Sequence, residues 1–130
     1  MGADKTGDII WVCDSWGGNL FEINTRTLKT NFVPLPSPDD EPYHATVDSN
    51  HNVWVNMMDD DRIMEYDPKK SEWTSFPLPT LGAESRFVSL LEQNGPMRVI
   101  VPYSRARKIA LMTIRSQEEL QSLKEMAQKR

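Results

Sequence analysis

Residues 43–79 read YHATVDSNHNVWVNMMDDDRIMEYDPKKSEWTSFPLP, and this stretch decides the fold. It contains four short runs rich in apolar, β-branched and aromatic residues, at positions 43–47, 53–56, 62–66 and 72–76. Turn-forming Asp, Ser, Asn, Pro and Lys residues separate the runs, and Pro77 and Pro79 remove backbone donors that a longer strand would need. The stretch therefore predicts four antiparallel strands.

The same pattern occurs in two other parts of the chain. Trp11-Val12 returns as Trp54-Val55, and Pro34-Leu35-Pro36 returns as Pro77-Leu78-Pro79, both at an offset of 43 residues. A looser third copy, around Val99-Ile100-Val101, follows a three-residue slip at positions 92–96. Repeats of this length with four strands each are typical of β-propeller blades. A β-sandwich also has closely spaced short strands, but it does not predict an echo at a fixed long offset.

These observations predict an all-β fold of four-stranded antiparallel propeller blades, followed by a helix. The partial propeller is expected over residues 1–115, with repeats near 8–36, 42–79 and 85–114, or about two and a half to three blades. We expect the first copy to begin at its second strand and the third to end after its third. Typical propellers close with about four to eight blades. The chain is therefore expected to be a fragment of a larger propeller or to close as a homo-oligomer, most simply a dimer with six blades.

The C-terminal segment, residues 116–130, has a different pattern. Ser116 and Glu119 form a capping-box sequence. Leu120, Leu123, Met126 and Ala127 then follow at helical spacing. We predict an amphipathic helix that either covers an edge of the sheets or lies between subunits.

Composition excludes several classes of partner. The net charge is −4 and the hydrophobic fraction is 38%. The basic residues are dispersed, so the chain lacks the concentrated basic face that nucleic acid requires. Its apolar runs are too short to predict a membrane span. The single cysteine, Cys13, excludes an intramolecular disulfide. We expect a soluble protein, cytoplasmic as the sequence is written, or periplasmic or secreted if the chain is a fragment.

Three segments resemble the blades of the streptogramin B lyase family: Pro42–Val55, Arg62–Pro68 and Phe76–Pro79. Blades of that family read approximately Pro-His-x-Ile, then Asp-x-x-Gly-x-Ile-Trp-Phe, Ile-x-Arg-x-Asp-Pro and a closing Leu-Pro. The resemblance covers about residues 8–114 and implies the propeller fold. In the family, a histidine acts as base and glutamates hold the Mg²⁺ that polarises the substrate for elimination. Shared blades alone do not fix a reaction.

The resemblance gives His44 one of two roles. His44 stands ten residues before Trp54, as a family histidine does. If the third repeat is the family's last blade, the position of the base falls on Phe87 and that of one metal carboxylate on Ser85. His44 would then contact substrate, and the catalytic pair would be missing.

In the other alternative, the second repeat is the catalytic blade and His44 is the base. The family's glutamate positions then fall on Pro42 and Met58, and the nearest carboxylates, Glu41 and Asp59, are each one residue out of register. A one-residue slip reverses side-chain direction on a strand, although loops are more forgiving. Under this alternative Glu41 and Asp59 are the candidate Mg²⁺ ligands. No other cofactor is expected.

In a propeller, the loops entering the innermost strands and those joining the second and third strands gather at one end of the central channel. Concave loop regions with aromatic and charged side chains are typical small-ligand sites. The candidate ligand-binding residues at this mouth are Asp14, Trp16, Tyr43, His44, Asn56, Arg86 and Tyr103.

These candidates leave three functions open. The leading prediction is non-catalytic binding of a small molecule or peptide at the channel mouth. The first alternative is a Mg²⁺-dependent C–O lyase that opens cyclic depsipeptides with His44 as base. The second alternative is a structural assembly module.

Overall fold

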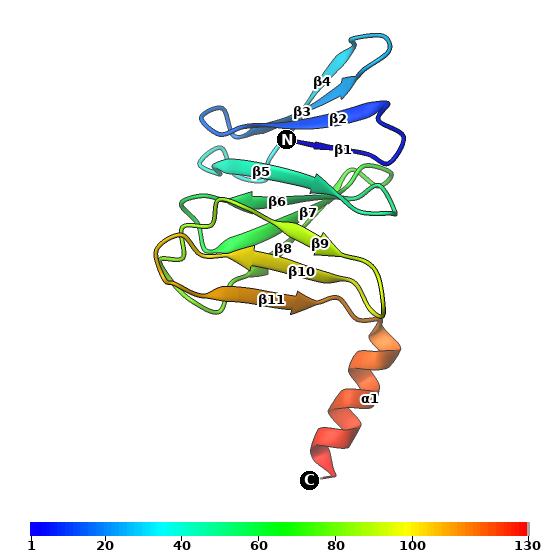
Figure 1. Cartoon of the computed structure of the whole chain (residues 1–130), viewed down its shortest axis with the longest axis vertical. Coiled ribbons are helices and arrows are strands. Elements are labelled where there is room, and N and C mark those ends of the chain that lie inside the picture. The colour runs from blue at the N-terminus through cyan, green and yellow to red at the C-terminus, as the bar shows by residue number, and fades with distance from the viewer. Residues whose placement is uncertain (130) are drawn as a thin grey trace.

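The computed structural model describes residues 1–129, which form three antiparallel sheets and one helix (Figure 1). Blade 1 consists of β1 (Gly2–Ala3), β2 (Ile9–Asp14), β3 (Asn19–Asn24) and β4 (Thr30–Pro34). Blade 2 consists of β5 (Pro42–Val47), β6 (Val53–Met57), β7 (Arg62–Asp67) and β8 (Glu72–Pro77). Blade 3 consists of β9 (Ser89–Leu91), β10 (Arg98–Pro102) and β11 (Ile109–Thr113). Strands consecutive in sequence are neighbours in every sheet. The predicted fold class, propeller-type sheets with a C-terminal helix, is confirmed.

The expectation that the first sheet begins at its second strand is wrong. The short strand β1 occupies the innermost position, where Gly2 pairs with Trp11 and Ala3 with Ile10. A side chain at Gly2 would place its Cβ 2.7 Å from the carbonyl oxygen of Ala45 and 2.9 Å from the Cα of Thr46. Glycine therefore allows β1 to lie directly against β5. Two residues next to the N-terminus carry no alternating pattern, so sequence reasoning missed this strand.

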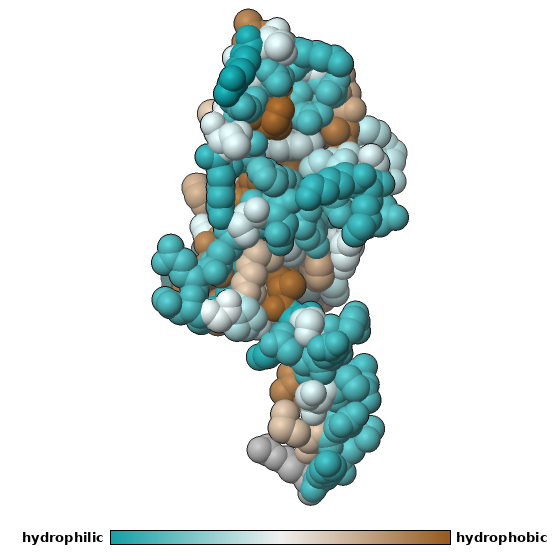
Figure 2. All heavy atoms as spheres, turned by 90° about the vertical axis from the view of Figure 1, so that its right-hand side faces the viewer, coloured by the Kyte–Doolittle hydropathy of each residue, from teal (hydrophilic) through white to brown (hydrophobic). Residues whose placement is uncertain are grey.

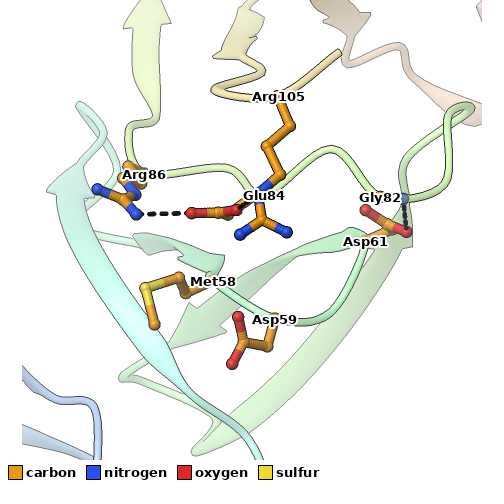
Figure 3. Close-up of a pocket in the computed structure, with 7 residues that line it drawn as sticks. All are labelled: Met58, Asp59, Asp61, Gly82, Glu84, Arg86 and Arg105. Carbon is orange, nitrogen blue, oxygen red and sulfur yellow. Dashed lines mark hydrogen bonds and ion pairs between the residues drawn. The ribbon is translucent and has the colours of Figure 1, made fainter.

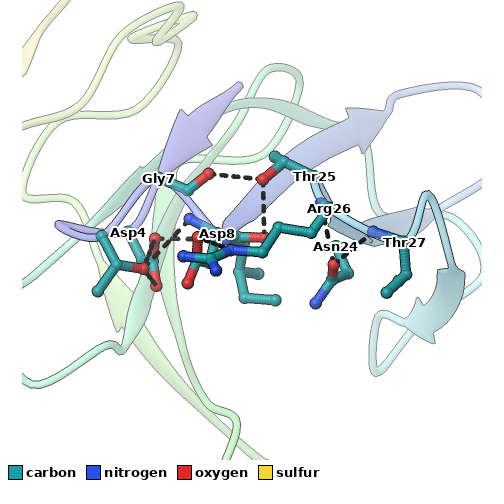
Figure 4. A network of polar contacts seen from close by, with 9 residues as sticks. Asp4, Gly7, Asp8, Asn24, Thr25, Arg26 and Thr27 are labelled. Carbon is teal, nitrogen blue, oxygen red and sulfur yellow. Dashed lines mark hydrogen bonds and ion pairs between the residues drawn. The ribbon is translucent and has the colours of Figure 1, made fainter.

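A polar network holds the loop between β1 and β2 against the turn between β3 and β4 (Figure 4). The Arg26 Nε donates to Asp8 Oδ1 at 2.8 Å, and the Thr25 hydroxyl donates to the carbonyl of Gly7 at 2.9 Å. Asn24 Oδ1 accepts from the backbone N–H groups of Arg26 and Thr27. These contacts keep β1 aligned on β2 although only two residues pair.

The first hydrophobic core lies between blade 1 and blade 2. Trp11 and Leu20 of blade 1 face Val53, Val55 and Tyr66 of blade 2, and all five are buried. The edge of one ring meets the face of the other at Trp11 and Tyr66, with centroids 5.8 Å apart. Successive strand residues point to opposite faces, so the strand residues that alternate with these five core residues lie on the other face of each sheet.

The second core lies between blade 2 and blade 3. Trp54 and Ile63, from the opposite face of blade 2, pack with Val88, Val99 and Val101 of the third sheet. The predicted roles of Trp11 and Trp54 as packing residues between sheets are confirmed by their burial. Blade 2 is thus covered on both faces, whereas blade 1 and blade 3 each have one neighbour.

The C-terminal helix α1 (Gln117–Gln128) begins at the predicted capping box. Ser116 Oγ accepts from the Glu119 amide at 3.2 Å, and Glu119 Oε2 accepts from the Ser116 amide at 2.9 Å. None of the described helix residues is buried. Figure 1 shows the helix extending away from the sheets, and Figure 2 shows hydrophobic atoms along one of its sides. The helix does not cover an edge of the sheets, and within residues 1–129 no helix is long and apolar enough to cross a membrane.

Candidate functional site

The candidate site, which we call the mouth, lies where loops of blade 2 and blade 3 meet. The loops between β6 and β7 and between β10 and β11 lie on one side of the molecule, together with the segments that enter β5 and β9 (Figure 1). The fully buried Asn56 joins them, because its Nδ2 donates to the Ser85 carbonyl at 2.5 Å. Its Oδ1 accepts from the backbone N–H of His44 at 2.9 Å. Asn56 was predicted to bind ligand, but its side chain lies beneath the mouth and fixes the loops above it.

A cavity of about 200 Å³ opens in the mouth of the molecule (Figure 3). It is lined by Met58, Asp59, Asp61, Gly82, Glu84, Arg86 and Arg105. We call it the arginine cavity. The segment entering β9 is anchored at its wall, because the Asp61 carboxylate accepts from the backbone N–H groups of Gly82 and Ala83 at 2.7 and 2.8 Å. This wall therefore has a defined shape before any ligand enters.

Two guanidinium groups in the arginine cavity share one carboxylate. The Nη2 of Arg86 donates to Glu84 Oε1 at 2.6 Å, and the Nε of Arg105 forms an ion pair with the other oxygen of Glu84. The Arg86 and Arg105 side chains are 53% and 78% exposed, whereas that of Glu84 is 14% exposed. Glu84 therefore faces two positive charges, and Asp59 and Asp61 bring the carboxylates that line the cavity to three. The remaining guanidinium N–H groups can donate to a ligand.

A second cavity of about 200 Å³ adjoins the first and shares Arg86 with it. Its other lining residues are Phe87, Pro102, Tyr103 and Ser104. Three of these residues present apolar surface, so we call it the aromatic cavity. The predicted ligand-binding residues Arg86 and Tyr103 come together here.

The imidazole of His44 lies on the ring of Phe87, with centroids 4.4 Å apart and the planes inclined by 21°. His44 is half-buried, and its Nδ1 is enclosed without a hydrogen-bond partner. Burial lowers the pKa of His44 below the usual histidine value. The imidazole is therefore neutral at pH 7 and can accept a proton. Tyr43, its exposed neighbour in β5, completes this side of the mouth.

The two predicted metal ligands, Glu41 and Asp59, lie side by side. The neighbouring carboxylate of Asp59 raises the pKa of Glu41, and burial adds to the shift. Glu41 Oε2 is buried and has no hydrogen-bond partner within residues 1–129. Mg²⁺ is commonly held by one or two carboxylates and keeps several waters, so this pair fits such an ion. No group of three His, Cys, Asp or Glu side chains within residues 1–129 comes together in a metal-binding arrangement.

The two candidates from blade 1 line neither cavity. Trp16 is 87% exposed in the turn between β2 and β3, and Asp14 accepts from the Gly17 amide at 3.2 Å in the same turn. The Ser15 hydroxyl ties this turn to the Pro42 carbonyl at 2.6 Å. Ligand binding by Asp14 and Trp16 stays a prediction. The thiol of Cys13 is mostly buried, and burial raises its pKa to about 12, so it stays protonated at neutral pH.

The loops that carry Asp61, Glu84 and Arg105 were expected at the mouth, but these residues and Met58 were not named as ligand-binding, and Phe87 was considered only as the position of the family's base. Glu84 and Arg86 are two residues apart in the segment that enters β9. Arg105 joins them only because the hairpin of β10 and β11 returns to the segment that enters β9, where Ser85 bridges to Tyr103. That closure depends on tertiary structure, so no local pattern could have shown it.

Comparison with known proteins supports the fold. No protein-family model matches the chain, and no curated protein sequence matches it significantly. Among solved structures, a streptogramin B lyase is similar with a TM-score of 0.65 and 19% identity over 84% of this chain. The virginiamycin B lyase of Staphylococcus aureus is similar with a TM-score of 0.64 and 14% identity over 89% of this chain. The extracellular domain of a putative one-component system from B. thetaiotaomicron has a TM-score of 0.54 and 14% identity over 85% of this chain.

The chain spans 38% and 41% of the length of the two lyases, and 16% of the third protein. At such low identity, the similarity shows the fold alone. The chain is a partial propeller whose sheets are arranged as in the streptogramin B lyases.

Proposed function

We propose that the mouth binds a small molecule or peptide without converting it. The observation that carries this proposal is the pair of adjoining cavities, about 200 Å³ each, with Arg86 lining both. Aromatic surface on one side of a fixed, partly exposed charge is a common arrangement in small-ligand sites.

The lining residues favour a particular ligand chemistry. Arg86 and Arg105 present planar sets of N–H donors that suit carboxylate or carbonyl oxygens. Glu84 fixes both side chains, so little side-chain freedom is lost when a ligand binds. Phe87 and Tyr103 offer the aromatic cavity to a ring or an aliphatic group. The best fit is an oxygen-rich molecule with an aromatic or apolar part, as in a short peptide or a cyclic depsipeptide.

Binding alone is favoured because of the position of Phe87. Its ring lies on the imidazole of His44 and covers one face of the only histidine near the cavities in the described part of the chain. If the third repeat corresponds to the family's last blade, the base position falls on this phenylalanine, which has no proton to exchange.

A second function, Mg²⁺-dependent elimination, is supported by a different observation. The neutral imidazole of His44 belongs to the same mouth as the carboxylate pair Glu41 and Asp59. In this alternative His44 accepts the proton that the substrate loses. Glu41 and Asp59 would hold Mg²⁺, which polarises the substrate when bound.

A titration separates the two functions. Quinupristin is a suitable probe because a catalytically inactive virginiamycin B lyase was solved with it. We expect isothermal calorimetry to show saturable binding with and without Mg²⁺, and reversed-phase chromatography to recover the unchanged peptide. Arg86→Ala should weaken binding by about tenfold or more, the loss typical of a charged hydrogen bond. Arg115→Ala, which removes an exposed arginine outside the mouth, should leave affinity unchanged.

Other outcomes of this titration decide against the proposal. Absence of saturable heat would overturn depsipeptide binding. Equal losses of affinity in Arg86→Ala and Arg115→Ala would show that the peptide is attracted by positive charge in general and is not bound at the mouth. Ring opening that requires Mg²⁺ and is lost in His44→Ala would establish the lyase function instead.

A further inference from the structure

The two end sheets each leave one apolar face uncovered. We call the face that a blade turns toward the following blade its forward face, and the opposite one its rear face. The forward face of blade 3 carries Leu91, Ile100, Ile109 and Leu111, which lie on the side of the sheet opposite to Val99 and Val101. The rear face of blade 1 carries Ile10, Val12, Phe21, Ile23 and Phe32, on the side opposite to Trp11.

Both uncovered faces match faces that pack inside the chain. The cross-strand pair Trp11 and Glu22 lies on the forward face of blade 1. The cross-strand pair Trp54 and Glu65 lies on the forward face of blade 2. The pair Ile100 and Leu111 occupies the corresponding place in blade 3. On the rear face, Ile10 and Ile23 form the pair that corresponds to Val53 and Tyr66. Inside the chain, each forward face packs on the rear face of the next blade. The forward face of blade 3 can therefore pack on a rear face, and the rear face of blade 1 is uncovered.

The exposed side chains on these faces are large. Ile109 is 70% exposed, Phe32 is 68% exposed and Leu111 is 58% exposed. At the place of Leu111, blades 1 and 2 carry the glutamates Glu22 and Glu65, so the forward face of blade 3 has a leucine where the two covered forward faces have a carboxylate. Contiguous apolar faces of this kind mark interaction sites in soluble proteins.

We propose that the partner is a second copy of this chain, packed head to tail. The forward face of blade 3 in each copy lies on the rear face of blade 1 in the other. Residues 1–129 of one copy form three sheets, fewer than the four to eight of typical propellers, whereas the same residues of two copies form six. Both free faces of each copy are then used, and the contact closes on itself without growing into a filament. This proposal does not depend on ligand binding at the mouth.

The helix α1 is the competing partner for the same apolar surface. Its Leu123 and Met126 are 41% and 57% exposed, on a helix that extends away from the sheets. A dimer held by two helices would bring like surfaces together around a twofold axis, whereas the proposed contact joins two different faces. Variants on each surface distinguish these arrangements.

Sedimentation velocity of the chain at micromolar concentration is the test. We expect one species of about twice 14.9 kDa. Leu111→Asp on the forward face and Phe32→Asp on the rear face should each raise the dimer dissociation constant by about tenfold or more, the effect of losing one buried side chain and burying a charge. Leu81→Asp is the matched control, because Leu81 is 87% exposed and lies outside both faces. Leu123→Asp should also leave the dimer intact.

Mixing the two variants gives a signature that only a head-to-tail contact produces. In the mixed pair, the unchanged forward face of the Phe32→Asp copy meets the unchanged rear face of the Leu111→Asp copy. One junction is thus unchanged and the other carries both substitutions. Because a junction already opened by one Asp loses little more from a second, the mixture should associate more tightly than either variant alone.

Several results would overturn the proposal. These are a monomer at micromolar concentration, a dimer that survives both face variants, and a dimer lost only in Leu123→Asp. Failure of the mixture to recover association would also count against it. Circular dichroism of each variant checks that the sheets remain folded. We expect them to remain folded because the substituted side chains are exposed.

Discussion

The contact between His44 and Phe87 is the residue-scale feature on which the chemistry of the mouth depends. His44 belongs to β5 of blade 2, and Phe87 belongs to the segment that enters β9 of blade 3. Their stacking buries the imidazole and lowers its pKa. A base that must exchange protons with a substrate needs an accessible nitrogen, so the neighbour of this histidine matters as much as the histidine itself.

Replacing Phe87 should therefore bring the pKa of His44 closer to the usual histidine value. In Phe87→Ala we expect the pKa of His44 to rise toward 6.5, because burial is the main cause of its lowered value. Proton NMR titration of the imidazole signals measures the change, with Leu28→Ala as a control, because Leu28 is 76% exposed and lies outside the mouth and both end faces. An unchanged pKa in Phe87→Ala would contradict the role of the ring.

The same shift predicts the sign of a pH effect on stability. The folded-state pKa of His44 lies below the unfolded value, so the unfolded chain binds the proton more readily. The contribution of His44 to the free energy of unfolding is present above pH 6.5 and is lost as the pH falls through the folded-state pKa. This contribution should be smaller in Phe87→Ala.

The residues at the mouth were only partly predictable from the sequence. Spacing from Trp54 indicated His44, and the expected loop positions indicated Arg86 and Tyr103. The burial of Asn56 was not predicted, because its partner Ser85 lies 29 residues away. The meeting of Arg105 with Glu84 was missed for the same reason. Residue type and spacing identify candidates, whereas pairings between sheets require the fold.

At the scale of elements, the best-patterned sheet was predicted almost to the residue. The expected runs 43–47, 53–56, 62–66 and 72–76 match β5, β6, β7 and β8, each of which is extended by one residue at an end. Alternating apolar residues and strong turn sequences explain this agreement. The helix α1 was equally clear from its capping box. The strand β1 was not, since Gly2 and Ala3 carry no such pattern.

The hairpin between β5 and β6 depends on one buried carboxylate. Asp48 Oδ1 accepts from the backbone N–H groups of Asn50 and Asn52 at 2.8 and 2.9 Å, and Oδ2 accepts from the Trp54 indole at 3.1 Å. Asp48 is 2% exposed. Asp48→Ala leaves these donors unpaired, including the buried indole, so we expect a loss of about 2–3 kcal/mol in the free energy of unfolding.

Urea denaturation followed by tryptophan fluorescence measures this loss. Asp39→Ala provides the control, because Asp39 is an exposed aspartate in the loop that enters β5. The expected change for the control is within about 0.5 kcal/mol. Similar midpoints for Asp48→Ala and Asp39→Ala would show that the hairpin does not depend on Asp48.

At the scale of the whole molecule, the stacking of the sheets explains both the mouth and the end faces. Blade 2 is buried on both faces, which places the loops of blades 2 and 3 side by side and leaves one apolar face free at each end. The sequence predicted the stack through its 43-residue offset. It could not show that α1 stands away from the sheets, because an amphipathic pattern indicates an apolar side but not its partner.

The stacking itself is tested most directly by nuclear Overhauser effects between aromatic rings of different sheets. We expect cross-peaks between Trp11 and Tyr66, which join blades 1 and 2, and between His44 and Phe87, which join blades 2 and 3. Phe21 and Phe32, within blade 1, provide a positive control at a centroid distance of 4.8 Å. Cross-peaks for the control pair without either pair between sheets would contradict the stack, and with it the mouth and the two free faces.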